Sequence, residues 1–560
     1  MNAPERIVLI GYGPVGARFV EELLPAVADG LVELAVVGGE DVEAYNRVLV
    51  AEYAVGGTAL ESMLVGDRAG AEHAGARMLL GTTARAIDRA ARTVGLSTGE
   101  AVPYDRLVLA TGARANVPTL DGVERPHRDL RSLERRPASL VGRDDRLPTG
   151  VTTLRDLDDA ERVLASVRAR ERIVVLGAGV LGLELALAAT HAGADVCVVH
   201  HGPHPMPRNL DRGAGLVLAA AARRSGLSVV ANSRAEAVGY RGADDARRFD
   251  RLVTADGKQL RGDLLVLSCG VTPRTELATL AGLRTAVGVV VHPWLQTWSD
   301  PAVYAIGDCA HIAERTGSAT DGAVVGAPSG LIGPGWRQAE WLAARFAADA
   351  RAAAVASTAA ATTGASRADA AAATGSIRPA AHDDAVLPPE REAIVMLKAE
   401  HLDVVAVGDV SADPWDDDPA TPRRRVAQWA DPEHGRYVKM VTEDGVLTAF
   451  AAVGMPRTAA ELTLLYDRGG ELPADRSLLL RLDGPDDDPG SATASLSPTA
   501  TVCWCNGVSA GRIEEVAACG ATTVEAVGRE TRAGTGCGGC RSRIEELLAR
   551  TADGAASAAA

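Results

Sequence analysis

The sequence has 560 residues and a formal net charge of −15, and only 3% of its residues are aromatic. The length predicts several domains, because a single hydrophobic core stops growing near ~250–300 residues. The acidic balance and the scarcity of aromatic side chains argue against nucleic-acid binding. No stretch approaches the roughly 18 uninterrupted apolar residues of a membrane span, and the N-terminus has no export signal. We therefore expect a cytoplasmic protein that binds neither nucleic acid nor membrane.

The first distinctive pattern is an apolar strand, a glycine turn and a helix, in RIVLIGYGPVGARFVEELL near the N-terminus. Gly11, Gly13 and Gly16 have the GxGxxG spacing, and Pro14 stands inside it. Such glycines permit a tight turn and a close approach of the backbone to a pyrophosphate at the helix N-terminus. Glu40 follows the next strand and is expected to accept the ribose hydroxyls.

A second unit of this kind begins at Arg172, in RIVVLGAGVLGLELALAATHAGADVCVVH. Gly177, Gly179 and Gly182 repeat the spacing, but His200 stands where an acidic residue would be expected. A single glycine turn can be purely structural. Two copies, each between a strand and a helix, favour two bound dinucleotides.

Two further strands also end in glycine turns. YDRLVLATGA contains Thr111 and Gly112, and LQTWSDPAVYAIGDCAH contains Gly307 and Asp308. A carboxylate such as Asp308 can bind the ribityl hydroxyls of a flavin.

With these motifs the chain resembles the two-dinucleotide-binding flavoprotein reductases over roughly residues 5–345. The resemblance implies an FAD-binding fold with an inserted NAD(P)H-binding fold. It makes Thr111, Gly112, Gly307 and Asp308 candidate flavin contacts. It also places Glu184 and Gly270, the latter in LSCG, beside the nicotinamide. The segment EAYNRVLVAEY resembles the ferredoxin, rubredoxin and nitrite reductase branch, in which Tyr45 and Arg47 would run under the flavin.

The stretch GPGWRQAEWLAARFA predicts a helix that begins near Trp336. In the family that the chain resembles, the N-terminus of this helix points at the flavin pyrimidine edge, where its dipole stabilises anionic reduced flavin. Simple packing is the alternative for Trp336 and Arg337.

Half of the eight cysteines form two tight pairs near the C-terminus, Cys503/Cys505 and Cys537/Cys540. Four thiolates can hold a [2Fe–2S] cluster or zinc. A reducing compartment disfavours disulfides, and the C-x-C spacing suits structural zinc poorly, so the cluster is favoured and zinc stays an alternative. The segment resembles bacterioferritin-associated ferredoxin in its cysteine spacing and in its two helices.

The other cysteines are expected to have structural roles. Cys197, Cys269 and Cys309 are interpreted as small buried hydrophobic residues, and Cys519 as a packing residue of the terminal segment. Residues 1–196 contain no cysteine, which excludes the flavin–disulfide relay of the disulfide-reductase branches.

We predict an α/β chain with two Rossmann-like folds, the first discontinuous, followed by a small α+β domain and a small helical domain. We also expect a helix over residues 150–164 and a frayed tail over residues 552–560. The expected domains are residues 1–124 and 268–346 for FAD, 151–267 for NAD(P)H, 347–388 for an alanine-rich linker or insertion, 389–482 for the α+β domain, 483–500 for a second linker, and 501–550 for the [2Fe–2S] domain.

This domain order resembles the N-terminal half of assimilatory NAD(P)H nitrite reductase large subunits. Those subunits continue into a sirohaem and [4Fe–4S] region with further cysteines, whereas none follows Cys540 here. We therefore expect that the chain does not reduce nitrite itself. It resembles instead the shorter electron-transfer subunit of assimilatory nitrate reductase.

The resemblance implies that electrons pass from NAD(P)H through FAD and the cluster to a partner, either a molybdopterin nitrate reductase or a sirohaem nitrite reductase. Hydride would pass directly from nicotinamide to flavin, so no catalytic acid or base is expected. The alternatives are a ferredoxin- or rubredoxin-type reductase, an NAD(P)H oxidase with a vestigial cluster, and an iron-mobilisation or redox-sensing module.

Nucleotide choice depends on His200. Without an acid to repel a 2′-phosphate or an arginine to hold it, we expect NADH to be preferred and NADPH tolerated. NADPH should gain as the pH falls and His200 becomes protonated.

Overall fold

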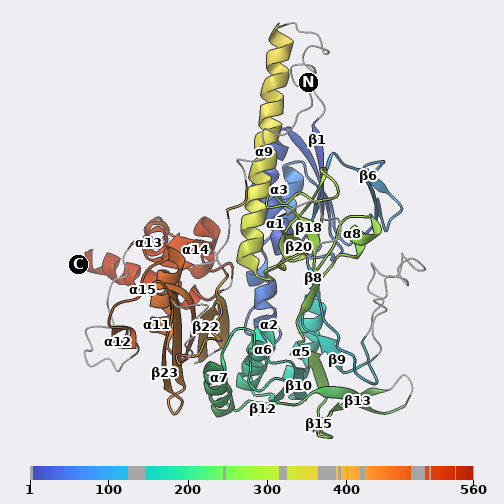
Figure 1. Cartoon of the computed structure of the whole chain (residues 1–560). Helices are drawn as coiled ribbons and strands as arrows, with labels where there is room; N and C mark the ends of the chain where they lie inside the picture. The colour runs from blue at the N-terminus through green and yellow to red at the C-terminus, as the bar shows by residue number, and fades with distance from the viewer. Residues whose placement is uncertain are drawn as a thin grey trace.

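The computed structural model describes most of the chain. Figure 1 shows a first α/β body that carries the long helix α9, a second α/β body below it, and the C-terminal parts beside them. The described residues are 4–123, 147–243, 247–314, 324–363, 386–388, 392–399, 402–415, 423–480, 483, 498–503, 506–536 and 538–558.

The first body is built on a five-stranded parallel sheet of order β19-β7-β1-β2-β3. Its strands are buried apolar runs, as expected for a parallel sheet covered on both faces. Helices α1 and α9 pack against each other, and their apolar side chains join the same core. The elements are β1 Glu5–Ile10, α1 Pro14–Ala28, β2 Val32–Val37, β3 Arg77–Leu79, β7 Arg106–Leu109, β19 Val303–Ala305 and α9 Ile332–Thr363.

Smaller elements complete this body. An antiparallel sheet, β4-β5-β6, follows β3, and β18 pairs with β20 in parallel. Because β19 lies beside β7, the main sheet takes strands from both sequence segments of the proposed FAD domain. The elements are α3 Arg68–His73, β4 Ala84–Asp88, β5 Thr93–Leu96, β6 Ala101–Pro103, α8 Glu276–Leu280, β18 Val289–Val291, η4 Gly307–Cys309 and β20 Ala310–Ile312. The short helices η1 Arg47–Leu49, α2 Val50–Tyr53 and η2 Leu60–Met63 also follow β2 in the chain, but their apolar side chains pack into the core of the second body.

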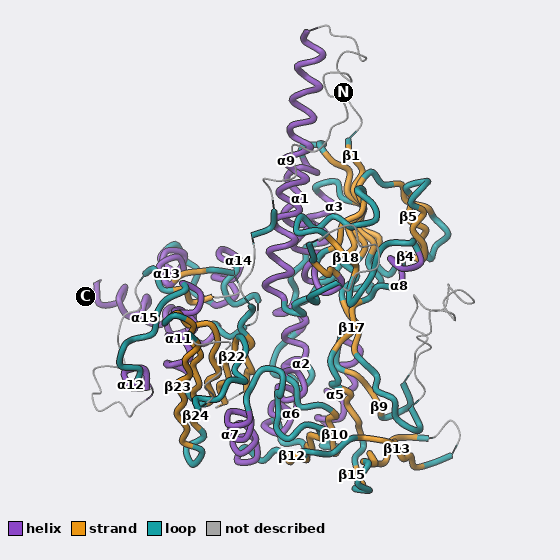
Figure 2. The backbone as a smooth tube through the Cα atoms, viewed as in Figure 1, coloured by secondary structure: helices purple, strands orange, loops and turns teal. Residues whose placement is uncertain are grey.

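The second body repeats the plan with a parallel sheet of order β12-β11-β10-β16-β9 and an antiparallel sheet β13-β14-β15. The antiparallel pair β8–β17 runs between the two bodies (Figure 2). The elements are β8 Ala113–Ala115, β9 Val151–Thr153, α5 Leu157–Arg168, β10 Arg172–Leu176, α6 Val180–His191, β11 Asp195–Val199, α7 Arg212–Arg224, β12 Ser228–Val230, β13 Ala235–Arg241, β14 Arg248–Thr254, β15 Gln259–Arg261, β16 Leu264–Leu267 and β17 Val271–Pro273.

The third part is a five-stranded antiparallel sheet of order β21-β22-β25-β24-β23. Alternate side chains face in opposite directions, so one face joins the core of the second body and the other packs on α11. The elements are β21 Val395–Ala399, β22 Leu402–Val407, β23 Arg424–Asp431, β24 Arg436–Glu443, β25 Val446–Val453, α11 Pro456–Arg468 and α12 Ser477–Leu480.

The C-terminal part is a short hairpin followed by three helices with their own small core. The predicted α/β class with a helical C-terminal domain is confirmed. The elements are β26 Thr501–Cys503, β27 Val508–Ser509, α13 Ala510–Ala518, α14 Val524–Thr531 and α15 Arg541–Ala558.

Three local predictions were wrong. Residues 150–164 are not one helix, because β9 comes first and Asp156 caps a helix that begins at Leu157. The expected linker begins too early, because α9 continues to Thr363 and its alanines at 347 and 350 are buried in the core. The expected frayed tail is helical as far as Ala558.

Candidate functional site

The first glycine turn joins β1 to α1. Gly11 has φ +114°, and a Cβ there would overlap the Ala110 carbonyl oxygen; a Cβ on Gly16 would overlap the Gly11 oxygen. Gly13 is different, because the nearest atom to an added Cβ is Arg47 Nε at 3.9 Å. Gly13 is also the N-cap, and it provides no side-chain hydrogen bond to the first N–H groups of α1. The turn therefore fits the pyrophosphate of a dinucleotide.

The second turn, between β10 and α6, has the same construction. Gly177 has φ +117° and lies against the Ser268 carbonyl, and Gly182 lies against the Gly177 oxygen. Nothing lies within 4 Å of a Cβ added to Gly179, which is the N-cap of α6. Both turns therefore leave the middle glycine open toward a ligand.

Glu40 follows β2 and is held by two side chains of its own body. The Tyr45 hydroxyl donates to Glu40 Oε2 at 2.9 Å, and Arg47 forms an ion pair with Glu40. Burial alone would raise the pKa of Glu40, but the Arg47 guanidinium and the Tyr45 hydroxyl outweigh it and lower that pKa. The carboxylate is therefore ionised and suited to accept ribose hydroxyls, and the sequence-predicted trio of Glu40, Tyr45 and Arg47 does come together.

Two arginines that sequence reasoning missed lie near the predicted flavin contacts. Arg155 Nη2 donates to Asp308 Oδ2 at 2.7 Å, and its Nε donates to the Ala113 carbonyl. Burial lowers the pKa of Arg274, and the guanidinium of Arg114 lowers it further. Arg274 is exposed and Arg155 half-buried. The neighbouring positive charges of Arg274 and Arg114 favour an anion, so these side chains fit a dinucleotide. Each arginine reaches the site from a distant loop, and no local motif marked either one.

The remaining predicted flavin contacts gather around the ends of β7 and β19. Thr111 Oγ1 donates to the Arg274 carbonyl at 2.9 Å, and the Gly307 N–H donates to Gln338 Oε1 of α9 at 2.8 Å. Gly112 and Gly307 have φ values of +67° and +71°, in the left-handed region that favours glycine. These turns bring the first segment of the body, its last strand and the start of α9 to one edge of the sheet.

Trp336 is a packing residue, as the alternative interpretation proposed. It lies one turn inside α9 and is 3% exposed, and its indole N–H donates to the Pro14 carbonyl at 3.0 Å. The helix begins at Ile332, and in its first turn a Cβ added to Gly335 would lie 3.6 Å from the Gly307 Cα, so the start of α9 lies against the Gly307 turn.

His200, which follows β11 in the second body, does not titrate near neutral pH. His200 is 5% exposed, and among the described residues its Nε2 has no hydrogen-bond partner. Burial, with His201 and His204 nearby, lowers the pKa of His200 to about 4. The expected protonation between pH 6 and pH 8 is therefore wrong, because the imidazole is neutral throughout that range.

Glu184 and Gly270 lie at the same end of the second body. Glu184 is half-buried in the second turn of α6, next to the open glycine turn. Gly270 has φ +82° and accepts a hydrogen bond from the Asn116 N–H at 2.9 Å, where the chain passes between the two bodies. Both positions are compatible with the predicted nicotinamide contacts.

The C-terminal cysteines come together as far as they are described. Cys503 and Cys540 are both buried, and hydrogen bonding with Cys540 lowers the pKa of Cys503 to about 6. Asn506 Nδ2 also lies 3.7 Å from Cys503 Sγ. Cys505 and Cys537 lie outside the described residues, and within those residues no group of three or more metal-binding side chains occurs. A buried thiolate with N–H donors around it suits an iron–sulfur cluster.

The other cysteines agree in part with their expected roles. Cys309 is buried, Cys197 and Cys269 are half-buried, and burial raises the pKa of all three thiols. Cys519 is exposed, so its assignment as a packing residue was wrong.

The described helices include none that is both long enough and apolar enough to cross a membrane. Residues 5–324 match the family model for pyridine nucleotide-disulphide oxidoreductases. Residues 501–550 match the model for the BFD-like [2Fe-2S] binding domain. The first match implies FAD and NAD(P)H as cofactors, and the second implies a [2Fe–2S] cluster in place of the zinc alternative.

Similar proteins cover nearly the whole chain. It is 25% identical to a nitrite reductase [NAD(P)H] of Bacillus subtilis (strain 168) over 98% of this chain and 58% of the relative. It is 27% identical to the assimilatory nitrate reductase electron transfer subunit of the same organism, over 97% of this chain and 59% of the relative. The chain thus spans less than two thirds of the length of these relatives.

A solved structure supports the same fold. The covalent putidaredoxin reductase–putidaredoxin complex superposes with a TM-score of 0.62 at 21% identity, covering 85% of this chain and 96% of that one.

Proposed function

Because the chain belongs to the pyridine nucleotide-disulphide oxidoreductase family, we propose that it oxidises NAD(P)H and transfers the electrons through FAD and a [2Fe–2S] cluster to a partner reductase. The first α/β body would bind FAD, the second NAD(P)H, and the C-terminal domain the cluster. The chemistry needs all three groups, since FAD takes two electrons as a hydride and can release them singly, while a [2Fe–2S] cluster accepts one at a time.

One observation carries this proposal. Asn46, which stands between Tyr45 and Arg47, donates from Nδ2 to the Thr535 carbonyl at 2.7 Å and also to the Gly536 carbonyl. The segment that would lie under the flavin therefore contacts the loop that leads to Cys537. Direct delivery of electrons to the cluster needs such proximity, whereas an oxidase would not.

The side chains would bind and orient the cofactors. Glu40 would accept the ribose hydroxyls of FAD, and Asp308 those of the ribityl chain, with Arg155 holding its carboxylate in place. Gly13 and Gly179 would leave room for the two pyrophosphates at the starts of α1 and α6. No side chain is required to move a proton in the hydride step.

NADH remains the proposed preferred nucleotide. A neutral, buried His200 offers a 2′-phosphate no positive charge, and the second body has no acid at this strand end to repel it. NADPH should therefore be accepted as well. The ratio of kcat/KM for NADPH to that for NADH should not depend on pH between 6 and 8.

The proposed terminal partner is a molybdopterin nitrate reductase, as the name of the electron-transfer relative suggests. A separate sirohaem nitrite reductase is the alternative, since a nitrite reductase matches over the same length of this chain. We place the reaction in the cytoplasm, where the thiolates stay reduced. Mixing the reduced protein with each candidate acceptor, and following reoxidation, separates the two.

Replacement of Cys540 tests the function. In protein purified without oxygen, NADH should rapidly bleach both the flavin and the cluster. Cys540→Ser should lose the cluster spectrum and electron delivery but keep FAD and its reduction by NADH. Cys519→Ser is the matched control, because Cys519 is exposed and outside the proposed ligand set. Stoichiometric zinc without iron or acid-labile sulfide would overturn the proposal.

A further inference from the structure

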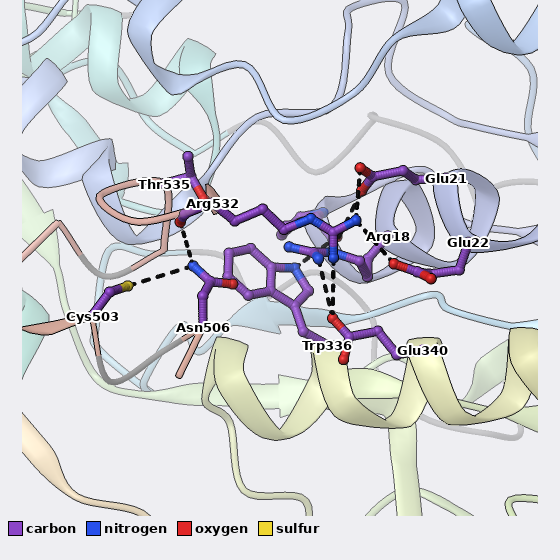
Figure 3. A network of polar contacts seen from close by, with 10 residues as sticks. Arg18, Glu21, Glu22, Trp336, Glu340, Cys503, Asn506, Arg532 and Thr535 are labelled. Carbon is purple, nitrogen blue, oxygen red and sulfur yellow. Dashed lines mark hydrogen bonds and ion pairs between the residues drawn. The ribbon is translucent and has the colours of Figure 1, made fainter. Parts of the chain in front are cut away.

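A single arginine of the C-terminal domain contacts two helices of the first body (Figure 3). Arg532 Nη2 donates to Glu21 Oε1 at 2.9 Å and to Glu22 Oε1 at 3.0 Å, and its Nη1 lies 3.6 Å from Glu340 Oε1. Glu21 and Glu22 come from α1, and Glu340 from α9. We call these three glutamates the carboxylate face.

Within the first body, the carboxylate face is also contacted by Arg18. Arg18 is 6% exposed, stacks over the Trp336 ring at 4.7 Å, and pairs with Glu340 at 3.1 Å and Glu21 at 3.6 Å. One arginine cannot balance three carboxylates. Burial and the nearby Glu340 carboxylate accordingly raise the pKa of Glu21 and Glu22. The face therefore favours a second cation, and Arg532 supplies it.

Asn46 makes an independent contact with the same domain. Its side chain is 1% exposed and donates to the carbonyls of Thr535 and Gly536, while its Oδ1 accepts from the Val48 N–H at 3.0 Å. One end of the amide thus caps η1 in the first body, and the other end binds the loop that joins α14 to α15.

The backbone of Arg532 has a conformation that glycine adopts more readily than arginine. Its φ of +64° and ψ of +4° place it in the left-handed region at the C-cap of α14, a position that favours glycine. Its carbonyl accepts from Asn506 Nδ2 at 2.7 Å, and that amide group also lies 3.7 Å from Cys503 Sγ. The backbone of Arg532 is therefore linked to Cys503 through Asn506, while its guanidinium binds the first body.

We propose that Asn46 and Arg532 are positioning residues that dock the C-terminal domain on the carboxylate face and hold its cysteine loop beside the flavin-side segment, residues 45–47. This inference rests on the proposed function, in which each NAD(P)H releases two electrons and one proton. The electrons leave the flavin one at a time for the cluster, and the proton passes to solvent. Docking fixes the distance over which each electron moves.

Arg532→Gly in the intact, cofactor-loaded chain is the main test. Glycine suits the left-handed backbone, so the domain should stay folded and keep its cluster spectrum. Amide hydrogen exchange over residues 533–536 should become faster, and electron transfer from flavin to cluster should slow by at least about tenfold, because the Asn46 contacts would then have to hold the domain without the Arg532 ion pairs. Reduction of the flavin by NADH should be unchanged.

Two further variants keep the test specific. Arg529→Ala removes an exposed arginine one turn earlier on α14 and should behave like wild type. Asn46→Asp keeps the oxygen that caps η1 but replaces the donor amide with a carboxylate that faces two carbonyls. It should repeat both effects of Arg532→Gly.

The outcomes separate this inference from the proposed function. Wild-type exchange rates and electron transfer in both Arg532→Gly and Asn46→Asp would overturn the docking role. If instead the loop loses protection in both variants, but NADH never reduces the cluster even in wild type, docking stands and the electron-transfer function fails.

Discussion

The two glycine turns have the same backbone but differ in the side chains around them. In each, the first and third glycines lie against a carbonyl oxygen and the middle one is open. The strand that follows the first turn leads to Glu40, which is kept ionised by Arg47, whereas the one that follows the second ends at His200, which is kept neutral by burial. The backbone thus has the same form in both proposed pyrophosphate sites, and we expect the surrounding side chains to determine which nucleotide each site holds and how firmly.

The largest expected effect comes from the first glycine of each turn. Gly11→Ala should destabilise the first body by about 3 kcal/mol or more and abolish FAD binding, because a Cβ would overlap a strand-end carbonyl at a positive φ. Gly177→Ala should leave FAD bound but abolish its reduction by NADH. For each variant, flavin absorbance after gel filtration measures FAD retention, and thermal unfolding measures the change in stability.

The control for this pair is Gly257→Ala. Gly257 also has a positive φ, +79°, but nothing lies within 4 Å of an added Cβ. It should cost only the backbone strain and leave both nucleotides bound. Loss of FAD from Gly177→Ala as well would contradict the division of labour between the two turns.

The next effect concerns Glu40. Glu40→Ala should weaken FAD binding roughly ten- to 150-fold, because charge-assisted hydrogen bonds worth about 1.5–3 kcal/mol are lost and Arg47 loses its ion-pair partner. Flavin retention on dilution measures the effect, and Glu33→Ala, exposed on the preceding strand, is the control. Equal retention by wild type and Glu40→Ala would remove Glu40 from the flavin site.

Smaller effects are expected at the middle glycines, where a substitution should weaken nucleotide binding and change protein stability little. Gly13→Ala and Gly179→Ala should lower the stability of the cofactor-free protein by no more than about 1 kcal/mol, since both residues have ordinary φ values and open surroundings and only the N-cap preference for glycine over alanine is lost. Each should weaken its own nucleotide about tenfold, near the low end of an overpacking cost of about 1–3 kcal/mol.

Binding and stability must be measured separately for this pair. FAD affinity should fall only in Gly13→Ala, and the KM for NADH should rise only in Gly179→Ala. If either variant without its nucleotide loses much more than about 1 kcal/mol of stability, the open surroundings inferred for that turn are wrong.

The smallest expected effect concerns His200, for which we expect no change of nucleotide preference with pH. The folded-state pKa of His200, about 4, lies below its ordinary value of about 6.5, so lowering the pH from 8 to 6 adds no proton to the imidazole. The ratio of kcat/KM for NADPH to that for NADH should therefore stay constant over this range. A ratio that rises as the pH falls, and becomes flat in His200→Gln, would show that His200 titrates after all.

The sequence predicted those parts of the site that local rules control. The glycine turns, Glu40 with Tyr45 and Arg47, and the two cysteine pairs stand in short segments where spacing and backbone conformation carry the signal. It failed where an alanine-rich helix gains its apolar contacts from a distant partner. The residues of α9 beyond 346 have no clear stripe of their own, and their burial depends on the first body.

The sequence by itself determined the two nucleotide folds and the thiolate cluster site, because tight turns and ligand spacing are properties of neighbouring residues. Only the tertiary structure decided which charges surround these sites. Arg155 reaches Asp308 across 153 positions, and Arg532 reaches the helix α1 across more than 500. It also decided that His200 is neutral, because its pKa depends on burial by elements distant in sequence. Contact and desolvation between distant segments exist only once the chain has folded.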